Sequence, residues 1–160
     1  MEIGLTQTSN WVKYPRGKMP SADFERARKF LCSFVGKTLS AIKCDEFHME
    51  LVFEDGSRFQ TQNSWRFIQD DSLLFGRGDI GGQVSKDVFG GLVGLKVASA
   101  SVSNCGDTAL RFKKDYIVQT ISDTVQYETW DAHLDAGWVI FGDGQIMVFP
   151  PAPIAPNSTE

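Results

Sequence analysis

The chain contains an internal repeat, and this repeat restricts its possible folds more than any other feature. Phe34-Val35-Gly36 is matched 58 residues later by Leu92-Val93-Gly94, and the spacing grows in small steps to 66 residues at Gly76 and Gly142. The matched landmarks keep the same order; the others are Leu51–Phe53 with Leu110–Phe112, Trp65 with Trp130, and Phe75–Ile80 with Phe141–Ile146. Small insertions in turns would produce this gradual increase in the spacing between matched residues. The order therefore predicts a tandem duplication, with each copy forming one supersecondary unit.

We expect two diverged copies, about residues 21–82 and about residues 83–149, packed together as one domain over residues 1–149. A length of 160 residues is within the usual size of a single domain. Four prolines lie between Pro150 and Pro156, and proline favours an extended chain. The segment 150–160 is therefore predicted to be a proline-rich tail.

The pattern within each copy predicts a helix, a glycine and then antiparallel strands. Phe24, Ala27, Leu31 and Phe34 recur at helical spacing, and Gly36 stands where a glycine commonly ends a helix. In the second copy the shorter helix is expected near residues 88–92. The predicted fold class is α+β, mostly antiparallel β: two helix-plus-β-meander units, with two sheets related by pseudo-twofold symmetry.

The expected strands follow from period-two alternation and from turn residues. Phe47, Met49, Leu51 and Phe53 alternate with polar neighbours, and Asp55-Gly56 predicts a hairpin turn. The expected strands of the first copy are 38–44, 47–53, 57–62, 65–68 and 72–75. Those of the second copy are 96–102, 108–112, 117–121, 126–132, 138–141 and 146–149.

Composition excludes several classes of protein. Apolar residues make up 42% and charged residues 22% of the chain, which is typical of a globular domain. No run of 18 apolar residues is present, so we expect no membrane association. The N-terminus lacks the pattern of a secretory signal. Three cysteines without C-x-x-C spacing favour buried thiols in a reducing compartment, and the protein is expected to be cytoplasmic.

Charge is distributed unevenly along the chain. After Lys114 there is no Lys or Arg, while seven acidic residues follow from Asp115 onwards. An acidic field repels phosphates, so nucleic-acid binding through this half is not expected. The same field would attract a basic protein partner. The alternative is that these residues form a solvated acidic face that serves solubility.

Two segments resemble sites of chemistry. Gly76-Arg77-Gly78-Asp79-Ile80-Gly81 fits G-x-G-x-x-G, but the residues after it are poor helix formers, so a turn is expected rather than a dinucleotide site. Asp131, His133 and Asp135 could converge as a metal or acid–base site if the segment is extended. A hairpin that ends with polar side chains outward is the simpler interpretation. We therefore expect no metal, no cofactor and no catalytic residues.

Other catalytic arrangements have little support. The two histidines, His48 and His133, are far apart in sequence, and no serine or cysteine stands in a nucleophile motif. His48 is expected to be exposed on the polar face of its strand. Paired carboxylates of the kind used in glycoside hydrolysis stay open as an alternative.

The segment Tyr127–Trp130 is a candidate aromatic and acidic contact patch, although core packing of both aromatic rings is the simpler expectation. The candidate partner-binding residues are Asp123, Glu128, Trp130, Asp131 and Asp135.

Leu92-Val93-Gly94, Leu110-Arg111-Phe112 and Tyr127-Glu128-Thr129-Trp130 before a terminal glycine turn resemble a group of small bacterial β-rich proteins. Some of that group are similar to immunity proteins encoded beside polymorphic or contact-dependent toxins. The resemblance covers residues 88–149 and implies no catalytic residues. The basic N-terminal helix region departs from it.

Two functions therefore follow as expectations. The first is a non-enzymatic binding protein, such as an immunity-type inhibitor of a basic toxin, for example a nuclease. The alternative is a module that binds a small ligand or carbohydrate, or an enzyme with a carboxylate site, in a cleft between the two copies.

Overall fold

Antiparallel strands in two sheets form most of the structure. The computed structural model describes residues 21–79, 84–123, 127–135, 137–142 and 145–151. The helices are α1 (Ser21–Cys32) and α2 (Val84–Leu92). The strands before α2 are β1 (Leu39–Cys44), β2 (Met49–Phe53), β3 (Arg58–Thr61), β4 (Ser64–Gln69) and β5 (Ser72–Gly76). Those after it are β6 (Val97–Val102), β7 (Thr108–Phe112), β8 (Tyr116–Ile121), β9 (Glu128–Leu134), β10 (Gly137–Gly142) and β11 (Gln145–Phe149). The predicted class, mostly antiparallel β with two short helices, is confirmed.

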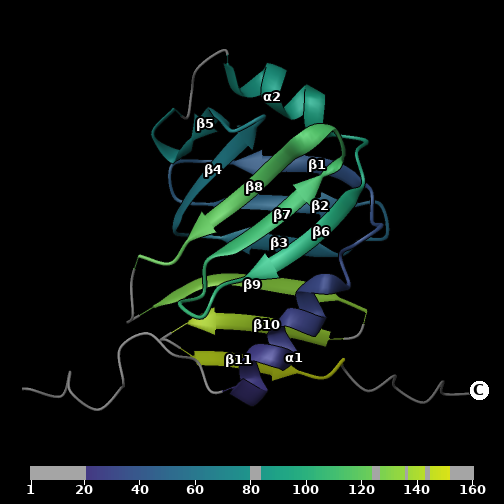
Figure 1. Cartoon of the computed structure of the whole chain (residues 1–160), viewed down its shortest axis with the longest axis vertical. Coiled ribbons are helices and arrows are strands. Elements are labelled where there is room, and N and C mark those ends of the chain that lie inside the picture. The colour runs from purple at the N-terminus through teal and green to yellow at the C-terminus, as the bar shows by residue number, and fades with distance from the viewer. Residues whose placement is uncertain (1–20, 80–83, 124–126, 136, 143–144, 152–160) are drawn as a thin grey trace, which may run out of the picture.

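Each sheet takes strands from both halves of the chain. The six-stranded sheet has the order β1-β2-β3-β9-β10-β11, and the five-stranded sheet has the order β5-β4-β8-β7-β6. In Figure 1 the five-stranded sheet lies in front, with β1, β2 and β3 passing behind it. Only the first three strands of each half form the expected meander. The following hairpin crosses to the other sheet, so β3 pairs with β9, and β4 pairs with β8.

The two halves are joined by a reciprocal set of backbone hydrogen bonds. The amide of Gly36 donates to Val97 O at 2.8 Å, and the amide of Gly94 donates to Leu39 O at 2.8 Å. Between these bonds, Thr38 and Lys96 form an isolated antiparallel bridge. Both glycines have positive φ, 87° and 89°, a backbone conformation that favours glycine. The turn after each helix therefore directs the next strand onto the other half.

One hydrophobic core fills the space between the sheets. On the six-stranded sheet Trp130 stacks between Phe59 and Phe141, with ring centroids 5.8 and 5.9 Å away. On the five-stranded sheet Trp65 lies 5.5 Å from Phe75. The helices close the ends of the core, because α1 packs against β6 and β11 and α2 packs against β5 and β1. Burial of these rings contributes much of the stability.

Several local predictions are corrected by the structure. Phe47 is 69% exposed because β2 begins at Met49, two residues later than predicted. Cys32 and Cys105 are exposed rather than buried, and only Cys44 is partly buried. Its burial raises the pKa of the Cys44 thiol to about 12, so this thiol stays protonated and a poor nucleophile. At the G-x-G-x-x-G segment Arg77–Asp79 form a 3₁₀ turn, and residues 80–83 lie outside the described part.

The reciprocal crossing makes a prediction about stability. Alanine at Gly36 or Gly94 meets no neighbouring atom, but its Cβ opposes the positive φ, so each change should destabilise the fold by about 1–2 kcal/mol. Gly90→Ala is the control. Gly90 lies inside α2 with open space around it, so this change should stabilise by up to about 1 kcal/mol. Urea denaturation measures all three, and a Gly36→Ala variant as stable as the wild type would contradict the crossing.

Candidate functional site

The outer face of the six-stranded sheet carries side chains in two cross-strand rows. Strand alternation turns them away from the core, because their neighbours Leu51, Phe59, Ala132 and Val139 are buried. One row runs through Lys43, Glu50, Gln60, Asp131, Ile140 and Met147. The other runs through Ala41, Val52, Arg58, His133, Trp138 and Phe149. Each row changes from polar or charged side chains on the central strands to apolar ones at the β11 edge.

At the β11 end the second row forms a stack of three rings, which we call the aromatic ladder: His133, Trp138 and Phe149. The ring centroids of His133 and Trp138 are 5.0 Å apart with 17° between the planes. Those of Trp138 and Phe149 are 5.2 Å apart with 31° between the planes. Trp138 is 36% exposed, and Phe149 and Met147 are each 40% exposed. His133, Trp138, Phe149 and Met147 together form an apolar strip on an accessible sheet face.

A chain of hydrogen bonds fixes the polar side of the ladder. Gln60 Nε2 donates to both oxygens of Asp131, at 2.9 and 2.8 Å. Its Oε1 therefore faces His48 Nε2, 3.1 Å away, and this histidine nitrogen must be the donor. His133 Nε2 lies 3.0 Å from Asp131 Oδ1, so the carboxylate holds the imidazole against Trp138. A surface organised before binding loses less entropy when a partner docks.

The other predicted acidic residues lie apart from one another instead of forming one cluster. Asp123 is exposed beyond β8, and its Oδ2 accepts a hydrogen bond from Ser64 Oγ at 2.8 Å. Glu128 is exposed at the start of β9, and Asp135 is exposed in the turn after it. Seven residue steps separate Glu128 from Asp135, which at the rise of a strand is roughly 23 Å. Asp131 lies between them, within the hydrogen-bonded chain.

Tyr127 and His48 lie differently from the simplest expectation, whereas Trp130 agrees with it. Trp130 is buried in the core, as expected, and its Nε1 donates to Gly106 O at 2.7 Å. It is therefore inaccessible to a partner. Tyr127, expected in the core, is 70% exposed. His48 was expected to be simply exposed, but it is partly buried against Gln60.

Sequence reasoning missed Trp138, Met147 and Phe149. A signal was present, because Trp138-Val139-Ile140-Phe141 is apolar at every position. Such a strand has apolar side chains on both faces, whereas the core of a two-sheet structure covers only one of them. The apolar side chains on the second face then need an explanation other than core packing.

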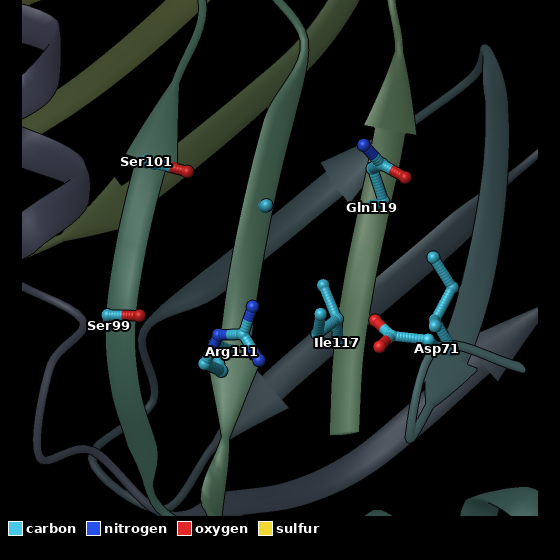
Figure 2. Close-up of a pocket in the computed structure, with 8 residues that line it drawn as sticks. Asp71, Ser99, Ser101, Arg111, Ile117 and Gln119 are labelled. Atoms are coloured by element: carbon cyan, nitrogen blue, oxygen red, sulfur yellow. The ribbon is translucent and has the colours of Figure 1, made fainter. Parts of the chain in front are cut away.

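The outer face of the five-stranded sheet is different in character. It contains a hollow of about 370 Å³, lined by Ile68, Asp71, Ser99, Ser101, Ala109, Arg111, Ile117 and Gln119. Figure 2 shows Ser99 and Ser101 one after the other along one strand, Arg111 on the next, Ile117 and Gln119 on the third, and Asp71 at the far rim. This hollow combines one cation (Arg111) and one anion (Asp71) with polar and aliphatic side chains, in contrast to the aromatic ladder.

The predicted metal or acid–base cluster is only partly assembled. Asp131 and His133 are in contact, whereas Asp135 lies in the turn beyond β9. Across the described ranges, no group of three or more His, Cys, Asp or Glu side chains is arranged to hold a metal ion.

No family model, curated protein or solved structure matches the chain. Among the described helices, none is long and apolar enough to cross a membrane.

The exposure of the ladder can be measured by fluorescence. Of the four tryptophans, Trp65 and Trp130 are buried, and Trp11 lies outside the described residues. In a Trp11→Phe background we expect acrylamide to quench Trp138 far more than the other two. A second change, Trp138→Phe, should then remove the quenchable emission. If this change leaves the quenchable fraction intact, Trp138 is not the exposed ring.

Proposed function

We propose that the protein is a non-enzymatic binding protein that recognises a basic protein partner through the outer face of β9, β10 and β11. The observation that carries this proposal is the exposed aromatic ladder, held in place by Asp131 and Gln60. Tryptophan and methionine are enriched in protein interfaces, and a few such side chains usually supply most of the binding energy.

The geometry of the ladder favours a protein surface over a sugar. Carbohydrate rings stack on an open aromatic face, but Trp138 lies between His133 on β9 and Phe149 on β11. Both faces of the indole are therefore covered, and its edge is what solvent reaches. The exposed ring edges of the ladder and the neighbouring Met147 side chain form a strip. Such a strip would fit an apolar depression on another protein.

The charge on β9, β10 and β11 supports a basic partner. The chain has no Lys or Arg after Lys114, so β9, β10 and β11 carry none. Glu128 and Asp135 are exposed at the two ends of β9. Exposed charges at the rim of an interface mainly raise the association rate. The apolar strip would supply the affinity, and the carboxylates would attract the partner.

An immunity-type inhibitor of a basic toxin, such as a nuclease, is the specific form of this proposal. A nuclease carries a basic surface that binds nucleic acid, and an acidic protein with an apolar strip would cover it. This function places the protein in the cytoplasm and needs no cofactor.

The alternative is a module that binds a small ligand. The specific observation in its favour is the hollow on the five-stranded sheet, to which both halves of the chain contribute. This hollow lies on an outer face, and its lining carries one guanidinium, that of Arg111, and one carboxylate, that of Asp71.

We also infer that the two halves arose by duplication. The strand orders β1-β2-β3-β9-β10 and β6-β7-β8-β4-β5 correspond one to one under exchange of the halves. The reciprocal bonds of Gly36 and Gly94 support the same correspondence, as do register shifts at the start of both β1 and β6. Among the strands described in the first half, none corresponds to the edge strand β11, which bears Met147 and Phe149.

The proposal is tested by affinity purification from the native host with three baits: wild type, Trp138→Ala and Arg111→Gln. The wild type and Arg111→Gln should recover the same basic protein, because Arg111 lies on the other sheet. Trp138→Ala should lose it, since removal of a central interface tryptophan costs at least about 2 kcal/mol, a factor of roughly thirty in affinity. Recovery that is equal for Trp138→Ala, or lost only with Arg111→Gln, would refute this binding surface.

The exposed carboxylates of Glu128 and Asp135, at the rim of the proposed interface, should affect the rate of association. With the purified partner, Glu128→Gln together with Asp135→Asn should slow association about three- to tenfold at low salt, because steering falls with the rim charge. The difference should shrink at 0.5 M salt, where screening extends to only a few ångströms. Lys113→Met with Lys114→Met is the control and should not slow association. Unchanged rates for the carboxylate variant would exclude a basic partner at this face.

A further inference from the structure

We propose that the hollow on the outer face of the five-stranded sheet is a binding site for a small aliphatic monocarboxylate. The site belongs to the opposite face from the aromatic ladder, and it is independent of the protein-binding function proposed above.

Two rows in register build the hollow. One row runs through Ser101, Ala109, Gln119 and Arg66, and the other through Ser99, Arg111, Ile117 and Ile68. Their neighbours along the strands, including Leu110 and Val118, are buried in the core. The small side chains on β6 and β7 leave space above the sheet, and Arg111 rises beside this space (Figure 2). The volume of about 370 Å³ is at the small end of the range for ligand pockets, roughly 300–1,000 Å³.

Arg111 is the anchor of the site. Within the described part of the chain, no hydrogen bond or ion pair occupies its guanidinium, whereas the Nε of Arg66 donates to Gln119 Oε1 at 2.7 Å. A free guanidinium offers paired N–H donors that match the two oxygens of a carboxylate. The hydroxyls of Ser99 and Ser101, on the neighbouring strand, are two further donors.

The rest of the lining sets the class of ligand. Ile117 and Ile68 lie next to Arg111 in the same row, so a ligand whose carboxylate meets Arg111 would lay a short aliphatic chain over them. Asp71 lies at the far rim, beyond Ile117. Its charge repels a second anionic group, which disfavours dianions, phosphate and nucleic acid. One carboxylate on an apolar chain fits all of these groups.

The test is an NMR titration of the ¹⁵N-labelled protein with three probes: 4-methylpentanoate, the uncharged 4-methylpentanamide and inorganic phosphate. We expect 4-methylpentanoate to shift the Arg111 side-chain Nε–H and the amides of Ser99, Ser101 and Gln119. The amide probe and phosphate should bind at least about tenfold more weakly, because each lacks the single carboxylate that Arg111 pairs with.

Two variants on the same face have opposite expected effects. Arg111→Gln should weaken 4-methylpentanoate about tenfold or more, the usual loss for a charge-assisted hydrogen bond. Asp71→Asn should strengthen it about two- to threefold by removing a nearby like charge. Arg58→Gln, on the other sheet, is the matched control and should change nothing. Equal binding of acid and amide, no effect of Arg111→Gln, or shifts spread over every exposed Lys and Arg would each overturn the proposal.

Discussion

The backbone crossing at Gly36 and Gly94 is the constraint on which the rest of the structure depends. Each glycine donates its amide across to the strand that begins the other half. A β-branched or bulky residue would be strained by the positive φ at either position. The crossing places β1 and β6 so that each half starts a separate sheet. The later hairpins β4-β5 and β9-β10 then pair with the sheet of the opposite half.

Exchange of hairpins produces a molecule with two chemically different outer faces. In each sheet a glutamine from the third strand of one half pairs with a charged residue from the other half. Gln60 bonds to Asp131 on the six-stranded sheet, and Gln119 bonds to Arg66 on the five-stranded sheet. The same framework therefore carries a carboxylate on one face and a guanidinium on the other. An aromatic ladder accompanies the carboxylate, and a hollow accompanies the guanidinium, so the faces suit different ligands.

Much of the fold could be predicted from the sequence, because its signals are local. Alternation located the strands to within a few residues, and the glycines after each helix gave the chain reversals. The sheet order could not be predicted, since nothing in the sequence of Ser64–Gln69 indicates that β4 pairs with β8 and not with β3. Long-range pairing depends on the packing of Trp65 and Trp130 in one shared core, and that packing has no local signature.

The candidate site was predictable only in part. Asp131 and His133 were expected on one face, and the structure brings them within 3.0 Å. The acidic run after Lys114 suggested one acidic surface, but the structure places Asp123 beyond β8, Glu128 at the start of β9 and Asp135 in the turn after β9. Trp130 was placed in the candidate set as part of the aromatic and acidic segment Tyr127–Trp130, yet its position in β9 turns it into the core. Trp138 needed knowledge of its neighbours His133 and Phe149, which come from other strands.

Methyl NMR of the four methionines is the most direct test of the central claim, that the outer face of β9, β10 and β11 is the binding surface. With ¹³C-methyl methionine in the protein and the basic partner recovered by the wild type, Met147 reports on the ladder and Met49, fully buried in the core, is the internal control. The account predicts that the Met147 methyl signal shifts and saturates at one equivalent of partner while the Met49 signal stays in place. A stable complex in which the Met147 signal does not move would contradict it.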